Sequence, residues 1–343
     1  MSFLNEKRAT IKDVARRAGT SIATVSNVLN GTGRVSADTQ MKIKRIMQEL
    51  DYSPSTAARN LKDKRSSLIA VIVPYLAAGS LLDNPFYWQL VAGIEEEARL
   101  ERFHFILVGA EPDESFAFVK ERQLDGLIVI GAFKGTDILD RIQQLKAPCI
   151  FVDSYLDDDS LYQIRLDDEL GGYIGTRHLI SLGHRDIALL SGELQEKGVH
   201  YYRWLGYCRA LEEANIPVRK ELVLEEPVSS ISGYRAAARI GAQAAEVSAV
   251  FCLSDVMAIG LMKGLHDIGL KVPGHISVMG FDNSQQAGYT IPALTTVSQD
   301  TVQKGRNAVR CLIALMNGET AIERTFVQSV ELVLRQSTGS KAE

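Results

Sequence analysis

The sequence has little of what a membrane-bound, exported or disulfide-bonded protein needs. Its 343 residues include only four cysteines and no CxxC pair, so neither a zinc site nor a redox-active cysteine pair is expected. No apolar run approaches the roughly 18–20 residues of a membrane span. Residues 1–13 lack the apolar stretch of an export signal. These absences predict a cytoplasmic protein that makes no membrane contact and keeps its cysteines reduced.

Motifs of common catalytic and cofactor sites are missing as well. The chain contains no GxGxxG after a predicted strand, and no GxxxxGK[ST], GxSxG or HExxH. Its six histidines have no carboxylate or cysteine at ligand spacing, and we interpret them as surface or capping residues. The acidic run 157–159 is typical of a solvated loop. The sequence therefore predicts no metal, no cofactor and no enzymatic activity.

Basic residues are slightly fewer than acidic residues, and they are unevenly distributed along the chain. The net charge is −4, yet residues 1–67 carry 13 Lys and Arg against 6 Asp and Glu. The rest of the chain is correspondingly acidic. A small basic segment joined to a larger acidic part suggests that only the basic segment meets a polyanion such as nucleic acid.

Residues 10–31 predict two short helices joined by a tight turn. Thr10 and Asp13 have the form of a capping box, and Gly19 can take the left-handed conformation that ends a helix. A second helix begins after Ser21, and apolar residues at helical spacing predict a third at about 36–50. Two helices joined in this way make a helix-turn-helix, whose second helix enters the DNA major groove.

The exposed face of the second helix distinguishes DNA binding from the alternative of a plain three-helix bundle. Ile22 and Ala23 lie opposite the apolar stripe, where a core has no use for them but a thymine methyl group does. Asn27, one turn after Ala23, has the donor and acceptor that adenine requires. Residues 53–61 predict a further helical stretch, which is too short to be stable alone.

These segments resemble the LacI/GalR family of bacterial transcription regulators. The resemblance is carried by TIKDVARRAG (10–19), TVSNVLNG (24–31) and the pattern Y-x-P-x-x-x-A-R-x-L that begins at Tyr52. It implies that the bases are read by Ile22, Ala23 and Asn27. It implies phosphate contacts by Thr10, Ser21, Ser26 and Asn30, and a minor-groove hinge made by Arg59, Leu61 and Lys62. The base-reading trio contains no arginine, so the operator sequence does not follow from the resemblance.

From residue 67 onward, short β-branched runs alternate with helical stretches, as in parallel doubly wound sheets. With the resemblance, the expected fold class is α/β: an N-terminal three-helix helix-turn-helix head plus a hinge helix, then a two-lobed doubly wound effector domain of the periplasmic-binding-protein type. The expected domains are a DNA-binding domain at 1–51, a hinge helix and linker at 52–67, a ligand-binding and dimerisation domain at 68–336, and a C-terminal tail at 337–343. Lobe 1 is expected at about 68–160 and 293–320, and lobe 2 at about 161–290 and 321–336.

The resemblance extends through the body and implies a small-molecule pocket between the lobes. Its ligand contacts are Arg203, Asp282 and Asp255. A guanidinium and a carboxylate suit the paired acceptors and donors of a sugar diol. The alternative for Arg203 and Asp282 is a surface ion pair.

Three aromatic residues precede the first long helix of the body. Phe86, Tyr87 and Trp88 offer an aromatic platform for the apolar face of a sugar, with core packing as the alternative for each. The stretch 74–86 is longer than is usual in the family, and 109–124 is shorter. Both lie in lobe 1, so we expect a remodelled pocket mouth or dimer surface.

The sequence thus predicts a ligand-responsive transcription regulator, a repressor of sugar-utilisation genes. It is expected to bind a near-palindromic operator as a homodimer, with a sugar or sugar phosphate as its effector. One alternative is control by a phosphocarrier protein or by a non-sugar ligand. The remaining alternative is a solute-binding protein, which would need an export signal and no DNA-binding segment.

Overall fold

The structure is a computed structural model, and it describes residues 9–52, 65–74, 83–111, 115–131, 137–194, 196–319, 321 and 323–341. The chain divides into two compact units, the head (Met1–Ser66) and the body (Ser67–Glu343). The expected hinge residues Arg59, Leu61 and Lys62 lie outside the described residues. Among the helices within the described ranges, none is long and apolar enough to cross a membrane.

Three helices make up the described part of the head: α1 (Ile11–Ala18), α2 (Ile22–Asn30) and α3 (Ala37–Glu49). Thr10 and Asp13 form the predicted capping box, and Ser21 accepts a hydrogen bond at the start of α2. Gly19 has a φ of +66°, the left-handed conformation that ends α1 and lets α2 begin three residues later. The helices share a small apolar core of Val14, Ala15, Ala18, Val25, Ile43 and Ile46.

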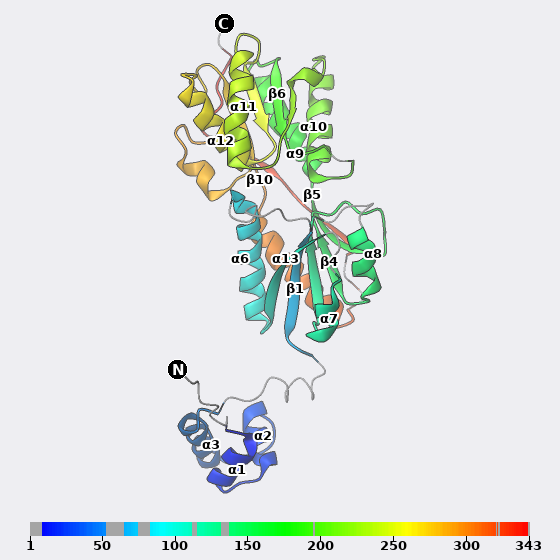
Figure 1. Cartoon of the computed structure of the whole chain (residues 1–343), viewed down its shortest axis with the longest axis vertical. Helices are drawn as coiled ribbons and strands as arrows, with labels where there is room; N and C mark the ends of the chain where they lie inside the picture. The colour runs from blue at the N-terminus through cyan, green and yellow to red at the C-terminus, as the bar shows by residue number, and fades with distance from the viewer. Residues whose placement is uncertain are drawn as a thin grey trace. The chain divides into compact units, whose positions relative to one another are not determined.

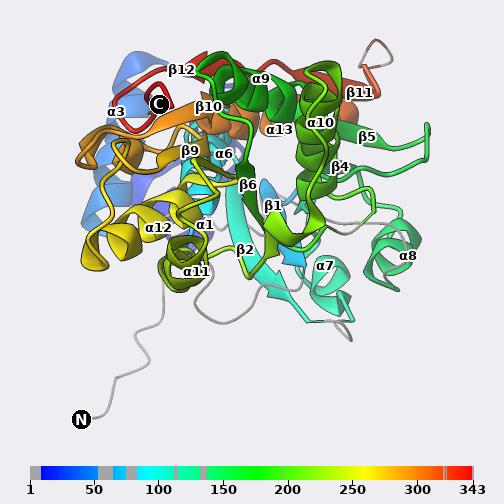
Figure 2. The same ribbon diagram turned by 90° about the horizontal axis from the view of Figure 1, so that it is seen from above.

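The first sheet of the body is parallel throughout, and its strand order is β11-β5-β4-β3-β1-β2. Figure 1 labels β5, β4 and β1 of this sheet. In chain order its strands are β1 (Leu68–Pro74), β2 (His104–Ala110), β3 (Gly126–Ile130), β4 (Cys149–Val152), β5 (Tyr162–Leu166) and β11 (Thr325–Gln328). One face packs on α6 (Pro85–Leu100) and α13 (Thr301–Met316), and the other on α7 (Ala117–Glu121) and α8 (Asp137–Gln144) (Figure 2). This sheet and its helices form lobe 1. Both faces are apolar because helices cover both of them.

The second sheet has the order β12-β10-β9-β8-β6-β7, and β12 alone is antiparallel to its neighbour. Its strands are β6 (Ile187–Ser191), β7 (Val223–Glu225), β8 (Ala249–Cys252), β9 (Ser277–Asp282), β10 (Thr295–Ser298) and β12 (Glu331–Val333). One face packs on α9 (Asp168–Ser181) and α10 (Val199–Glu213), and the other on α11 (Ser230–Ala242) and α12 (Asp255–Asp267). This sheet and its helices form lobe 2.

The chain passes between the lobes three times, from β5 to α9, from β10 to α13 and from β11 to β12. These crossings differ from the expected lobe boundaries. Residues 293–320 were expected in lobe 1, but β10, near the start of that range, pairs with β9 in lobe 2. Residues 321–336 were expected in lobe 2, but they contain two strands, β11 in the first sheet and β12 in the second. Which sheet a strand joins depends on its partner, and a local apolar pattern does not identify that partner.

The segment expected as a C-terminal tail is hydrogen bonded into lobe 2 as far as Lys341. Ser337 is fully buried, and its carbonyl accepts a hydrogen bond from the backbone of Val278 at 2.9 Å. His184 contacts the carbonyl of Gly339 at 3.0 Å and is only 3% exposed. The prediction of a surface or capping role is therefore wrong for His184, because residues distant in sequence cover it.

Candidate functional site

The second helix of the head presents the predicted base-reading side chains. Ile22 is 45% exposed, and Ala23 beside it is also exposed, so neither belongs to the core of the head. Asn27 lies one turn after Ala23 and is half-buried. Its amide packs against Gly33, whose φ is +79°, and a Cβ at Gly33 would lie only 2.9 Å from Nδ2 of Asn27. The turn after α2 therefore fixes the position of the Asn27 amide.

Two of the predicted phosphate-contacting residues lie at helix N-termini, where backbone N–H groups favour anions. The backbone N–H and the hydroxyl of Thr10 both donate to the carboxylate of Asp13, at 3.0 and 2.6 Å. The Ser21 hydroxyl accepts a hydrogen bond from the backbone of Thr24 at 3.0 Å. Ser26 lies within α2, and the side chain of Asn30 is outside the described residues.

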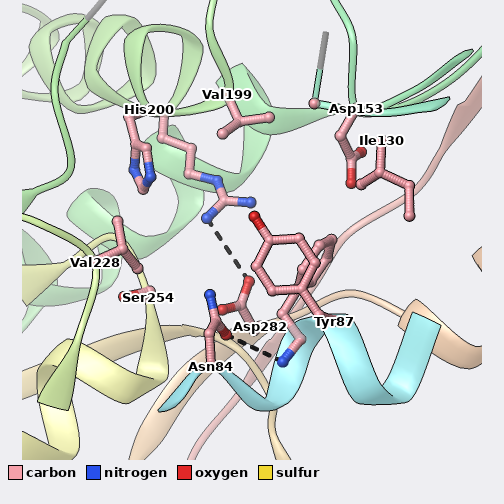
Figure 3. Close-up of a pocket in the computed structure, with 12 residues that line it drawn as sticks. Asn84, Tyr87, Ile130, Asp153, Val199, His200, Val228, Ser254 and Asp282 are labelled. Atoms are coloured by element: carbon pink, nitrogen blue, oxygen red, sulfur yellow. Dashed lines mark hydrogen bonds and ion pairs between the residues drawn. The ribbon is translucent and has the colours of Figure 1, made fainter. Parts of the chain in front are cut away.

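A cavity of about 150 Å³ lies between the two lobes of the body (Figure 3). Several of its walls come from the carboxyl ends of parallel strands, where open α/β sheets bind ligands. Ile130 ends β3, Asp153 follows β4, Ser254 follows β8 and Asp282 ends β9. From helices come Phe86 and Tyr87 in lobe 1, and Val199, His200 and Arg203 in lobe 2.

Arg203 is the cation in the lobe 2 wall, and it is buried rather than part of a surface ion pair. It is 6% exposed. Its Nε donates to Asp168 at 2.6 Å, and its Nη1 donates to the carbonyl of Leu253 at 2.7 Å. The Nη1 atom is 3.7 Å from Oδ1 of Asp282. The guanidinium also stacks on the ring of Phe281, with 3.6 Å between its carbon and the ring centroid.

Asp168 is a functional neighbour that the sequence did not single out. It begins α9 and is fully buried, between Arg203 and the hydroxyl of Tyr155 from lobe 1. Burial raises the pKa of Asp168, and the charge of Arg203 opposes that rise. The helices that carry this pair are closely packed, since a Cβ at Gly172 would lie 1.9 Å from the carbonyl oxygen of Arg203. The glycine thus allows α9 and α10 to bring Asp168 and Arg203 together.

Asp282 lies in the pocket wall in an uncommon backbone conformation, with a φ of +115°. Its Oδ1 accepts a hydrogen bond from the Gln299 amide at 2.6 Å. Burial raises the pKa of Asp282 to about 6, although Arg203 opposes this rise.

Asp255 was expected in the pocket but does not line it. Its carboxylate is buried, and it accepts hydrogen bonds from the Ser284 backbone and from the Thr296 hydroxyl, both at 2.6 Å. Burial and the neighbouring charge of Asp282 raise the pKa of Asp255 to about 7. Asp255 therefore supports the turn that follows Asp282.

Lys304 is a second buried cation that the sequence did not reveal. It lies on α13 and is 0% exposed. Its Nζ donates to both oxygens of Asp153, at 2.8 and 3.0 Å, and to Oε1 of Gln299 at 2.7 Å. Because Gln299 also donates to Asp282, a continuous polar network runs from Lys304 to Arg203. A lysine among apolar helical positions gives no signal of this role in the sequence.

The three aromatic candidates separate in the structure. Phe86 and Tyr87 line the pocket, whereas Trp88 does not and is 48% exposed. The rings of Phe86 and Tyr87 meet edge to face, with centroids 5.4 Å apart. Consecutive residues of a helix point in directions about 100° apart, so all three cannot face one pocket.

Comparison with known protein families supports the same division of the chain. Residues 10–55 match the bacterial regulatory proteins of the lacI family, and residues 176–338 match the periplasmic binding protein-like domain. A helix-turn-helix head with a two-lobed body of this kind defines a transcription regulator. The chain belongs to the LacI family of bacterial regulatory proteins.

Similarity to individual members extends over nearly the whole chain. The HTH-type transcriptional repressor PurR of Vibrio campbellii is 36% identical over 96% of this chain and 98% of its own length. The lac repressor dimer bound to operator and the anti-inducer ONPF is 30% identical, with a TM-score of 0.83 over 97% of this chain and 100% of that one. The complex of the transcriptional regulator CelR with cellobiose is 28% identical, with a TM-score of 0.73 over 96% of this chain and 100% of that one.

Proposed function

We propose that this regulator binds a near-palindromic operator as a homodimer, represses sugar-utilisation genes and responds to a sugar or sugar phosphate in the interlobe pocket. One observation carries the proposal. Arg203 and Asp282 are almost fully buried, 3.7 Å apart, in the wall of a cavity between two lobes. A guanidinium and a carboxylate held in this way can bind neighbouring hydroxyl groups of one ligand.

The DNA half of the proposal rests on the head. We assign base reading to Ile22, Ala23 and Asn27, phosphate contacts to Thr10, Ser21, Ser26 and Asn30, and minor-groove contacts to Arg59, Leu61 and Lys62. A single head reads too few bases to find one site among the roughly 10⁶–10⁹ competitors in a genome. Two heads related by two-fold symmetry double the site. The similar lac repressor binds its operator as a dimer, which supports this arrangement.

The ligand half rests on the pocket and on the similar CelR–cellobiose complex. We assign ligand contact to Arg203, Asp282, Phe86 and Tyr87, and we assign Asp255 to the support of Asp282. We infer binding rather than catalysis, because the known relatives are regulators and the charged groups of the wall, Arg203, Asp282 and Asp153, are each hydrogen bonded to a residue behind the wall. We place the protein in the bacterial cytoplasm, where its DNA is.

The test begins with selection of operator DNA from a random pool by the full chain. Gel shifts on the selected DNA then follow with and without cellobiose, ribose, glucose and their phosphate esters. We expect a near-palindromic sequence, a dimer on that sequence by sedimentation, and a change in affinity with at least one of these compounds. A pool that yields no preferred sequence, or a monomer bound to a single half-site, would contradict the proposal.

A further inference from the structure

The two cations nearest the pocket already hold carboxylates. All three hydrogens of the Lys304 ammonium have acceptors, since Nζ contacts both oxygens of Asp153 and Oε1 of Gln299 within 3.0 Å. Arg203 uses Nε for Asp168 and Nη1 for the Leu253 carbonyl. Lys304 therefore has no free N–H for a second anion, and the charge of Arg203 is already opposed by the carboxylates of Asp168 and Asp282.

Negative charge exceeds positive charge around the cavity. Among the described residues in its wall, Asp153 and Asp282 are the acids and Arg203 is the one cation. Behind the wall, Asp168 pairs with Arg203 and Lys304 pairs with Asp153, while Asp282 lies 3.7 Å from the Arg203 guanidinium. The set thus holds three carboxylates against two cations. A phosphate group in the cavity would lie close to these carboxylates, and like charges at short distance repel one another.

His200 adds a polar but uncharged group to the same wall. It lies on α10 next to Val199 and extends toward Val228 and Ser254 (Figure 3). Burial and, to a lesser extent, the charge of Arg203 lower the pKa of His200 to about 3, so the imidazole is neutral. Within the described part of the chain, its Nδ1 is buried and has no hydrogen-bond partner.

A buried polar atom without a partner is uncommon in native proteins, and because His200 itself lines the pocket, we take a ligand as the missing partner of its imidazole. Gly192 makes room for the imidazole, since a Cβ there would lie 2.7 Å from Nε2 of His200. A neutral imidazole has one donor and one acceptor, as a ligand hydroxyl does. The rings of Phe86 and Tyr87 complete the site with an apolar surface.

We propose that the pocket takes an uncharged, hydroxyl-rich ligand, an unphosphorylated sugar or alditol, and that His200 selects it by a hydrogen bond to one of its hydroxyls. This inference rests on the proposed function in one respect, that the interlobe cavity is the effector site. It narrows that function by removing sugar phosphates from the effector class.

Calorimetric titration of the full chain tests the charge argument without DNA. The compounds are neutral pentoses, hexoses, alditols and disaccharides, including ribose, glucose and cellobiose, each paired with its phosphate ester. We expect at least one neutral compound to bind, and its ester to bind about ten-fold or more weakly. An ester that binds more tightly than its parent, or a panel in which no neutral compound binds, overturns the inference.

A matched pair of variants tests His200. Asparagine places an amide near the position of Nδ1, whereas phenylalanine keeps the ring and removes both nitrogens. For the neutral sugar that binds the unmodified chain, we expect His200→Phe to weaken binding about ten-fold and His200→Asn to retain most of it. Equal affinities in the two variants overturn the assigned hydrogen bond.

Asp153→Asn gives a separate readout of the same charge balance. It leaves the ammonium of Lys304 without its carboxylate, so we expect the affinity for the phosphate ester to rise relative to the parent sugar. An unchanged ratio overturns the charge argument. Because none of these titrations uses DNA, a regulator that binds operator yet prefers an ester refutes this inference alone. A sugar-binding chain that selects no DNA refutes the proposed function alone.

Discussion

Asp255 shows how a single buried carboxylate can stabilise a ligand site that it does not contact. Its two oxygens accept hydrogen bonds from the Ser284 backbone and the Thr296 hydroxyl, which lie on either side of the turn after β9. That turn holds Asp282 at a φ of +115°, a conformation that costs on the order of 1–3 kcal/mol unless its surroundings enforce it. The two hydrogen bonds that Asp255 accepts help to hold the turn in this conformation.

The raised pKa of Asp255 gives stability a pH dependence of known sign. The native carboxyl titrates at about 7, whereas an unfolded aspartate titrates near 3.9. Between these values the native state holds a proton that the unfolded state has released, so this group's contribution to the unfolding free energy falls as pH rises. We therefore expect the stability difference between the unmodified chain and Asp255→Asn to shrink from pH 4.5 to pH 7.5.

Urea unfolding of both proteins across this range measures the effect. Its scale is about 1.4 kcal/mol for each unit of pKa difference. The asparagine variant is the matched control, because it keeps the shape of the side chain and does not titrate. Parallel stability profiles for the two proteins would mean that Asp255 is ionised throughout.

Asn27 is the residue for which DNA readout can be tested most directly. Asn27→Ala removes the amide that we assign to adenine, so binding should weaken by about 1–3 kcal/mol per half-site and the preference at one base pair should relax. Binding-site selection with the variant checks this. Ser26→Ala is the control, since loss of a phosphate contact weakens all sequences alike. An unchanged selected motif for Asn27→Ala would show that α2 docks differently.

At the residue scale, the sequence predicted the pocket residues that belong to a recognisable motif. It did not predict the residues that only the fold places beside them. Arg203 and Asp282 were predicted and lie together. Asp168, Lys304 and His200 were not, because their importance comes from contacts with residues far along the chain. Asp153 and Lys304, for example, are joined by an ion pair across 151 positions.

At the scale of elements, the N-terminus of α11 is held by the opposite lobe. Asp83, which precedes α6, accepts hydrogen bonds from the backbone N–H and the hydroxyl of Ser230, at 2.9 and 2.7 Å. A carboxylate at this position satisfies a free N–H group and complements the helix dipole. Lys197 of lobe 2 forms a second interlobe contact, an ion pair with Asp157 of lobe 1. The lobes are therefore joined by side chains as well as by the three crossings.

A double-mutant cycle measures the first of these contacts. We expect Asp83→Ala to lower the unfolding free energy of the body by about 1–2 kcal/mol. Ser230→Ala should then cost less in the Asp83→Ala background than in the unmodified chain, since its partner has already gone. Urea unfolding of the two single variants and the double variant supplies the numbers. Strictly additive losses would show that the contact contributes nothing.

Long and strongly patterned elements were the predictable ones. The β-branched runs of β1, β3 and β4 and the capped helices of the head follow from local sequence alone. The short strands β5 and β7 and the helix α8 were missed. β5 carries Gln163 and Arg165 among its five residues, so it lacks the apolar run that identifies a buried strand. The polar side chain of Gln163 can be buried here because both its amide oxygen and its amide nitrogen hydrogen bond to the backbone of Leu156.

At the scale of the whole molecule, we expect DNA binding and ligand binding to be separable by mutation. Asp282→Ala removes the ligand contact that we propose for Asp282 and leaves α2 unchanged, so the response to a bound sugar should disappear while ligand-free affinity for operator remains. Leu61→Ala should do the reverse, weakening operator binding and sparing sugar affinity, if Leu61 wedges the minor groove as we propose. Gel shifts and calorimetry on both variants check the pair. A normal response from Asp282→Ala would mean that the effector binds elsewhere.

The three crossings between the lobes have a consequence for how the protein is made. A ribosome releases the chain from its N-terminus at about 5–20 residues per second. The helices of the head are contiguous, so the head can fold as soon as it emerges. Neither sheet of the body is complete until β11 and β12 appear near residues 325–333, and the segment through Lys341 must still close over His184. A nascent or truncated chain can therefore carry a finished DNA-binding head on a body that is not yet able to sense its effector.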